Sequence, residues 1–306
     1  MNRTSSALLA ATLAAAVLVA APVESQAKLR VVTTTQDLAW FVRSIGGAEV
    51  DAANILKGFQ DPHFAAAKPS YMVEISRADL LLYVGMDLEI GWLPLIMQGA
   101  RNPTVMPGEK GSLDCSQFVT PIEVPVAGAD RSKGDLHPKG NPHYWLDPDN
   151  AKQLARGIAD RLTLLEPEQA ATFKAGLDRV LAEIDRADTE ARAIIAAGPV
   201  PPIVTYHVTF SYFFKHYGLQ TAGFIETKPG IPPTPSHVAG LVSMLQGLAH
   251  PPVVLVEPYY DLDVPRKLGD QTGGRVVVTA SSIGGTDAVK SYRDLFVGIA
   301  NAIVGK

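Results

Sequence analysis

Cysteine is almost missing from this 306-residue sequence, which contains only Cys115. A lone thiol excludes an internal disulfide, and a chain of this length can bury a core large enough to fold without one. It also argues against a cysteine-rich structural zinc site, since no second cysteine or histidine lies at zinc-finger spacing beside Cys115. We expect this residue to lie partly buried in a loop.

Charge of one sign is also scarce. The net charge is only −4, no cluster of lysine and arginine alternates with aromatic residues, and the sequence has no acidic or basic tail. Proteins that bind nucleic acid present a basic patch or stripe to the phosphate backbone. The sequence therefore gives no indication of nucleic acid as a partner.

Hydrophobic runs long enough to span a membrane are absent. The longest apolar run, residues 7–21, has about 15 residues, whereas a membrane-spanning helix needs ~20. It follows a short basic start and precedes Ser25-Gln26-Ala27, which is typical of a signal-peptide cleavage site. We expect residues 1–27 to be an export signal that is cleaved near Ala27. Because no cysteine lies near that junction, we expect a periplasmic protein without a lipid anchor that does not itself span the membrane.

Short apolar runs alternate with helical patterns along the rest of the chain. The runs are rich in β-branched and aliphatic residues, which indicates buried parallel strands; they cover residues 29–34, 80–84, 203–206, 253–257 and 275–279. The helical patterns cover residues 70–76, 150–165, 210–216, 236–248 and 292–304. This alternation predicts an α/β fold, with parallel sheets flanked by helices.

The longest helical pattern, residues 167–197, divides the chain. Pro167 suits the first position of a helix, an apolar stripe runs along the segment, and Gly198-Pro199 ends it. At ~1.5 Å per residue this helix is roughly 45 Å long, about the diameter of a domain. We predict two α/β lobes, residues 28–166 and 198–306, joined by this rigid helix. An ordinary long helix packed inside one domain is the alternative.

Three histidines lie in three separate segments at turns or strand ends. His63 follows a proline turn, His143 lies just before a helical pattern, and His207 ends the strand predicted over residues 203–206. In open α/β sheets such positions face the ligand crevice. Neutral imidazole is a good ligand for zinc, copper, iron and nickel, so three converging histidines predict a transition-metal site. Each histidine taken alone could equally be a surface or structural residue.

The remaining histidines have weaker claims to a role in that site. His137 lies in the loop before His143 and could reach the metal, but we expect it to be solvated. We expect His216, His237 and His250 to be structural.

Several motifs follow one another in a fixed order along the chain. They are Gly58-Phe59-Gln60-Asp61-Pro62-His63, Gly140-Asn141-Pro142-His143-Tyr144-Trp145-Leu146-Asp147-Pro148, Thr205-Tyr206-His207 and Pro229-Gly230-Ile231-Pro232-Pro233. Together they resemble the metal-binding solute-binding proteins of bacterial ABC importers for zinc and manganese. The resemblance implies two lobes joined by a long helix, with metal in the cleft, held by His63 and His143 from the first lobe and His207 from the second. It also implies an ABC permease, with its ATPase, as the partner.

The fourth ligand position departs from the pattern of that family. The family usually places a carboxylate just after the last strand, where this chain has Ser281. A neutral hydroxyl is a poor ligand for a divalent ion, so we expect water or Glu257 to complete the site. Glu257 ends the strand predicted over residues 253–257, and its alternative role is to line the cleft without touching the metal.

The donor set favours Zn²⁺ over Mn²⁺ as the cargo. Three imidazoles without a clear carboxylate are a borderline-soft shell, whereas Mn²⁺ favours oxygen. We predict a monomeric, non-enzymatic protein that delivers Zn²⁺ to an ABC permease. The alternatives are a manganese-binding protein of the same type, an adhesin or metal buffer, and a secreted zinc hydrolase. The hydrolase is disfavoured because the sequence has no His-Glu-x-x-His motif.

Overall fold

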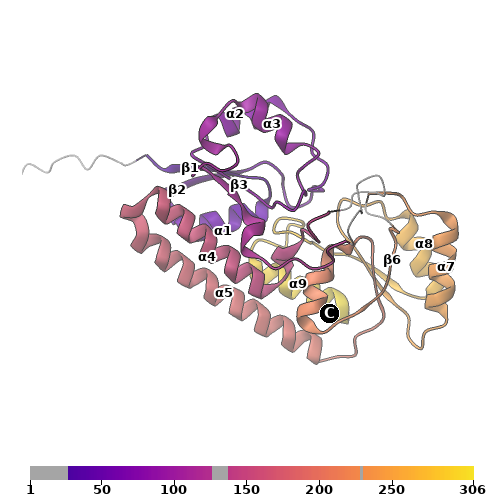
Figure 1. Ribbon diagram of the computed structural model, residues 1–306. Coiled ribbons are helices and arrows are strands. Elements are labelled where there is room, and N and C mark those ends of the chain that lie inside the picture. The colour runs from indigo at the N-terminus through magenta and orange to yellow at the C-terminus, as the bar shows by residue number, and fades with distance from the viewer. Residues whose placement is uncertain (1–26, 126–136, 228–229) are drawn as a thin grey trace, which may run out of the picture.

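The computed structural model of the protein describes residues 27–125, 137–227 and 230–306 (Figure 1). The expected export signal, residues 1–27, lies outside these ranges except for Ala27. Within the described ranges, none of the helices has the length and apolarity needed to cross a membrane.

Strands and helices alternate along the described chain, as the sequence pattern predicts. The strands are β1 (Leu29–Thr33), β2 (Val50–Asn54), β3 (Leu80–Tyr83), β4 (Ser112–Asp114), β5 (Ile203–Thr205), β6 (Thr221–Phe224), β7 (Val253–Val256) and β8 (Arg275–Val278). The α-helices are α1 (Gln36–Gly46), α2 (Pro69–Ser76), α3 (Leu93–Ala100), α4 (Pro148–Leu165), α5 (Ala170–Ala196), α6 (Ser211–Tyr217), α7 (Pro235–Gln246), α8 (Asp263–Thr272) and α9 (Tyr292–Val304). The predicted α/β class is therefore confirmed.

The strands form two parallel four-stranded sheets with the same internal order. That order is β2-β1-β3-β4 in the first sheet and β6-β5-β7-β8 in the second. In each sheet, the first strand in the sequence lies between the second and the third. The chain therefore adds its second strand on one side of the first strand and its third strand on the other side. The carboxyl ends of parallel strands at such a change of side face the crevice in which ligands bind.

Short polar side chains begin several helices and thereby fix where the chain leaves a strand or loop. The Thr35 hydroxyl accepts a hydrogen bond from the Leu38 amide at the start of α1. Asp147 accepts one from the Asp149 amide, 2.8 Å away, at the start of α4. Such caps satisfy amides that have no partner inside the helix. Asp147 is therefore the N-cap of α4.

Helix α5 confirms the long helix predicted over residues 167–197. It has 27 residues and is preceded by a 3₁₀ turn at Pro167–Gln169. It packs against α1 and α4 and also against α9, and Figure 1 shows α4 and α5 side by side. Gly176 permits the approach of α1, because a Cβ there would lie only 2.1 Å from the carbonyl oxygen of Ile45.

One apolar core extends through both halves of the chain. It contains Phe41 from α1, Phe173 from α5, Phe213 from α6 and Phe296 from α9, all fully buried. Smaller clusters lie beneath α2 and α3 and beneath α7 and α8. The two sheets are therefore held together by shared packing around α5 as well as by the covalent chain. The domain boundaries at residues 166 and 198 stay predictions.

Cys115 differs from the expectation of a partly buried loop residue. It is fully buried in the large core, directly after β4, with its sulfur 3.8 Å from the carbonyl oxygen of Leu113. Burial raises the pKa of the thiol well above its ordinary value. The sequence-based expectation was wrong because the short strand β4, which carries Cys115 into the core, was not predicted.

Candidate metal centre

The structure brings His63, His143 and His207 together, although they are far apart in the sequence. One ring nitrogen from each lies within 4.8 Å of the others, and all three residues are buried. The ring centres lie 5.2 Å apart for His63 and His143, 5.2 Å for His63 and His207, and 5.3 Å for His143 and His207. With a zinc–nitrogen distance of about 2.0–2.1 Å, tetrahedral ligation places imidazole centres about 5 Å apart. The three rings fit that geometry.

Two of the histidines are positioned by the same local motif. In Asp61-Pro62-His63, the Asp61 carboxylate accepts from the His63 amide at 2.9 Å and lies 2.8 Å from its Nδ1. In Asn141-Pro142-His143, the side-chain oxygen of Asn141 accepts from the His143 amide at 2.9 Å and lies 2.8 Å from its Nδ1. Side chains of Asp and Asn commonly bond their own backbone two residues further along. The repeated Asx-Pro-His pattern was present in the sequence but was not recognised as an orienting device.

His207 is oriented by a longer-range contact. It follows β5, and the Thr205 hydroxyl donates to its carbonyl oxygen at 2.7 Å. Its Nδ1 lies 2.9 Å from a carboxylate oxygen of Glu226, which follows β6. Parallel pairing of β5 with β6 brings these residues together. Sequence analysis did not assign this role to Glu226, because the contact depends on strand pairing.

These contacts determine where the protons lie on the three rings. Each Nδ1 faces an oxygen that acts only as an acceptor, so Nδ1 carries the hydrogen and Nε2 keeps its lone pair. The Asn141 amide is oriented by its own NH₂ group, which donates to Glu123 and to the carbonyl oxygen of Val208. All three Nε2 atoms are buried and have no hydrogen-bond partner among the described residues. Burial and the neighbouring imidazoles hold the pKa of His143 well below its ordinary value, which keeps this ring neutral.

Convergent, buried and unpartnered lone pairs are rare in proteins, because a buried polar atom without a partner destabilises the fold. They are the donor set of a divalent transition metal. The carboxylates of Asp61 and Glu226 contact the Nδ1 atoms of His63 and His207, on the ring side opposite Nε2. Such contacts orient the imidazoles and increase their basicity, as is common for residues that hydrogen-bond to metal ligands.

Glu257, the fourth ligand expected from the sequence, is fully buried at the end of β7 but does not belong to the group whose ligand atoms lie within 4.8 Å. Its Oε1 accepts a hydrogen bond from the Thr209 hydroxyl, and its Oε2 has no hydrogen-bond partner among the described residues. Burial, with smaller contributions from Asp61 and Glu226, raises its pKa to about 8. Its role as a ligand stays a prediction.

Ser281 follows β8, at the position where the resemblance noted from the sequence led us to expect a carboxylate. It is buried, and its carbonyl oxygen accepts a hydrogen bond from the indole nitrogen of Trp145 at 2.9 Å. The Trp145 ring in turn lies 5.4 Å from that of His143. Through Trp145, the segment after β8 is therefore connected to His143 of the three-histidine site.

His137 was expected to be solvated, and this expectation was wrong. It is only 7% exposed, its ring centre lies 5.3 Å from that of His63, and its Nδ1 lies 3.1 Å from the carbonyl oxygen of Met86. Sequence analysis missed this because the partner of His137, the carbonyl oxygen of Met86, lies in the loop after β3, 51 residues away in the sequence.

The second cluster of possible ligands is a network of ion pairs. His216 on α6 lies 3.3 Å from Asp147 through Nδ1 and 2.9 Å from Asp188 through Nε2, and exposed Asp149 is 3.9 Å away. Hydrogen bonding to Asp147 raises the pKa of His216. Both of its ring nitrogens already have protein partners, as expected for a structural residue. His237 is likewise structural, with Nε2 2.9 Å from the carbonyl oxygen of Phe224.

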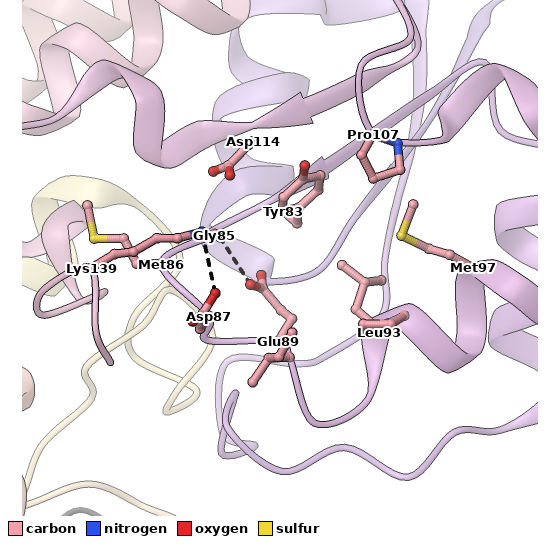
Figure 2. A pocket seen from close by; sticks show the side chains of 12 residues that line it. Tyr83, Gly85, Met86, Asp87, Glu89, Leu93, Met97, Pro107, Asp114 and Lys139 are labelled. Carbon is pink, nitrogen blue, oxygen red and sulfur yellow. Dashed lines mark hydrogen bonds and ion pairs between the residues drawn. The ribbon is translucent and has the colours of Figure 1, made fainter. Parts of the chain in front are cut away.

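A separate cavity of about 300 Å³ opens on the first sheet, behind Met86 (Figure 2). On one side Lys139 pairs with Asp87, 3.5 Å away. Near the centre of Figure 2, the buried carboxylate of Glu89 accepts a hydrogen bond from the Gly85 amide at 3.0 Å. None of the residues that line this cavity is a histidine, so it is distinct from the three-histidine site.

Comparison with known proteins gives a consistent result. A family model described as "Zinc-uptake complex component A periplasmic" (ZnuA) matches residues 31–305. The manganese ABC transporter substrate-binding lipoprotein PsaA of Streptococcus anginosus is 28% identical over 249 residues, which cover 80% of this chain and 76% of that protein. The iron ABC transporter substrate-binding lipoprotein MtsA of Streptococcus pyogenes serotype M1 is 28% identical over 239 residues, which cover 76% of this chain and 73% of that protein.

Solved structures share the fold. A crystal structure of ZnuA superimposes with a TM-score of 0.75 at 22% identity and covers 90% of this chain and 99% of that chain. The periplasmic zinc-binding protein TroA from Treponema pallidum superimposes with a TM-score of 0.71 at 21% identity and covers 91% of this chain and 99% of that chain.

Proposed function

Because this chain belongs to the ZnuA family of metal-binding solute-binding proteins of ABC importers, we propose that it captures Zn²⁺ outside the cytoplasm and delivers it to an ABC permease. One observation carries the proposal. Three buried Nε2 lone pairs converge, and each ring is already oriented by an oxygen at Nδ1. The family consists of transport proteins rather than enzymes, which excludes the zinc hydrolase considered from the sequence.

The cargo binds through the Nε2 atoms of His63, His143 and His207. The first two follow the Asx-Pro-His turns of the first half of the chain, and the third comes from the second sheet. Bound metal therefore bridges the two halves, and its charge is offset by Asp61 and Glu226 behind the ligands. The sequence leaves water or Glu257 as candidates for the fourth position, and Glu257 lies outside the group of converging ligand atoms among the described residues.

Zinc is the proposed cargo, although some relatives are named for other metals. PsaA and MtsA are named for manganese and iron, whereas TroA is named for zinc. The donor set supports zinc here, because the nitrogen cluster includes no carboxylate from the described part of the chain and Ser281 stands where an anionic oxygen was expected. Mn²⁺ prefers oxygen ligands. Cu²⁺ and Ni²⁺ bind such sites at least as tightly, so affinity alone does not identify the cargo.

The proposed location is the periplasm and the proposed partner is an inner-membrane permease with its ATPase. The export signal predicted over residues 1–27 and the family description support this location. We further propose that the protein works as a monomer, with one metal site in each chain.

The decisive test is metal binding by the metal-free mature protein. We expect one Zn²⁺ per chain in a competition titration, and a His143→Ala variant should bind zinc more weakly by several orders of magnitude, beyond the roughly 10–100-fold cost of losing a partner behind a ligand. His250→Ala is the matched control, because His250 is exposed and lies outside the cluster. Unchanged zinc affinity in His143→Ala would refute the assignment.

A growth experiment tests the transport role. Deleting the gene should impair growth when a chelator limits zinc, and added Zn²⁺, but not added Mn²⁺, should restore it. Rescue by manganese alone would show that the cargo had been wrongly assigned while the transport role stands. Normal growth under every metal limitation would contradict the transport role.

A further inference from the structure

We propose that His137 supplies a fourth imidazole to the bound metal, so that four histidines enclose the ion. This inference rests on the proposed function, because it concerns the same metal site. It replaces the water or Glu257 expected from the sequence and assigns a ligand to the position left open by Ser281.

The placement of His137 is the first support. It is buried, and its ring centre lies 5.3 Å from that of His63, the same spacing that separates the rings of the three converging histidines. His137 does not belong to the group whose nitrogens all lie within 4.8 Å. Its ring must therefore move toward the ion when the metal arrives.

The proton position on His137 matches that of the other three rings. Its Nδ1 lies 3.1 Å from the carbonyl oxygen of Met86. A carbonyl only accepts hydrogen bonds, so Nδ1 carries the hydrogen and Nε2 has the lone pair. His63, His143 and His207 show the same arrangement, each with an acceptor oxygen at Nδ1.

The loop that holds His137 has an unusual backbone. Gly85, Met86 and Asp87 all adopt positive φ angles, of 81°, 52° and 62°, and such values are uncommon for residues other than glycine. Glu89 fixes the start of this loop by accepting from the amides of Val84 and Gly85. Strained backbone of this kind is often retained at functional sites.

A second contact fixes the segment after His137 to the same loop. Lys139 lies 3.5 Å from Asp87, and Figure 2 shows Lys139 reaching along Met86 to that carboxylate. The His137 carbonyl also accepts from the Gly140 amide at 3.0 Å. His137 is therefore held between two attachments to residues 86 and 87, with its ring beside His63.

The alternatives for the fourth position have less support. Glu257 has one oxygen on the Thr209 hydroxyl and the other without a partner among the described residues. It lies outside the group of converging ligand atoms, and it lacks the direct packing against a ligand ring that joins His137 to His63 within the described chain. Ser281 offers only a neutral hydroxyl. Closed zinc sites are usually tetrahedral with four protein ligands. Four neutral imidazoles leave the ion with two positive charges, which Asp61 and Glu226, directly behind two of the rings, balance.

Cobalt substitution tests the proposal. In the wild-type protein, Co²⁺ should show a tetrahedral visible spectrum that azide does not change, because no ligand position is open. In His137→Ala, water takes that position, so azide should bind and shift the spectrum. Zinc affinity should also fall by more than about tenfold, since a direct ligand outweighs a partner behind one. His250→Ala is the control, and circular dichroism of each metal-free variant checks that it folds.

The other outcomes are equally clear. A wild-type Co²⁺ spectrum that responds to azide, or a His137→Ala protein identical to wild type, would overturn the proposal. If azide sensitivity appears in Glu257→Gln but not in His137→Ala, Glu257 is the fourth ligand and the proposal is wrong. His143→Ala distinguishes failure of the proposed function from failure of this inference. If His143→Ala binds zinc normally, the proposed function fails. If His143→Ala loses zinc binding but His137→Ala behaves like the wild type, only this inference fails.

Discussion

The two sheets have the same strand order, and each carries a buried glutamate after its third strand, but the two glutamates are used differently. In the first sheet, Glu89 accepts from the Thr34 hydroxyl and the Val84 amide at 2.7 Å each, and from the Gly85 amide at 3.0 Å. In the second sheet, Glu257 accepts from the Thr209 hydroxyl, and its other oxygen has no partner among the described residues.

This difference separates a carboxylate whose two oxygens are both engaged from one with an oxygen that has no partner among the described residues. Glu89 uses both oxygens to hold the loop at residues 84–89, which also presents the carbonyl of Met86 to His137. The Glu257 carboxylate holds the Thr209 hydroxyl, which follows β5 in the second sheet. A shared topology thus offers equivalent positions at the crevice, and the hydrogen bonds around each position decide what it does.

Removing Glu89 should affect stability most. Glu89→Ala leaves the amides of Val84 and Gly85 without their acceptor in a buried site, so we expect the free energy of unfolding to fall by about 2–4 kcal/mol. Glu257→Ala removes one accepted hydrogen bond and should cost about 1–2 kcal/mol. Urea denaturation of both metal-free variants measures the difference. Equal losses would show that the two glutamates play the same role.

The pH dependence of stability provides a finer test. Burial raises the pKa of Glu89 to about 7, above the ordinary value of about 4.3 that it has in the unfolded chain. The folded state therefore keeps a proton on Glu89 between these values, and the contribution of this carboxyl to the stability of the metal-free protein should fall as the pH rises from about 5 to about 7. Buried Asp37, whose pKa is also raised to about 7, contributes with the same sign.

Glu89→Gln isolates the contribution of one carboxyl to that dependence. Glutamine does not titrate, so the variant should lose less stability than the wild type from pH 5 to pH 7, while the contributions of Asp37 and Glu257 remain. Urea midpoints at several pH values give the two slopes. If the variant and the wild type decline in parallel, the Glu89 pKa is not the cause.

The smallest expected effect is a change of overall shape on metal binding. Helix α5 packs against α1, α4 and α9, and one buried core includes side chains next to both sheets. Wide hinge closure would disrupt that core, so metal should enter by loop movement with a small rotation at most. Solution scattering should give nearly the same radius of gyration with and without Zn²⁺. A marked compaction would contradict a rigid connection.

Much of this fold could be predicted from the sequence, but three of the four edge strands could not. The strands that were predicted are the four central ones, β1, β3, β5 and β7, and one edge strand, β8, all of which are continuous apolar runs or nearly so. The strands that were missed, β2, β4 and β6, all lie at sheet edges, where the sequence lacks a long apolar run. Helices α1, α3 and α8 were also missed, although α1 has a capping threonine, Thr35.

The residues of the candidate site also fall into those that the sequence could identify and those that it could not. His63, His143 and His207 could be identified because each lies in a short motif with its own local meaning. Their orienting partners were harder to find: Asp61 and Asn141 lie two residues away and repeat one pattern, whereas Glu226 reaches His207 only through strand pairing. The burial of His137 depends on the carbonyl of Met86, 51 residues away, which no local pattern indicates.

The most direct test of the central claim is a crystal structure of protein purified without added metal, with anomalous scattering measured at the zinc and manganese edges. We expect a single zinc peak bonded to the Nε2 atoms of His63, His143 and His207. A manganese peak at this position would contradict the cargo. A metal bound only at Asp147, Asp149 and His216, with nothing between the three histidines, would contradict the site itself.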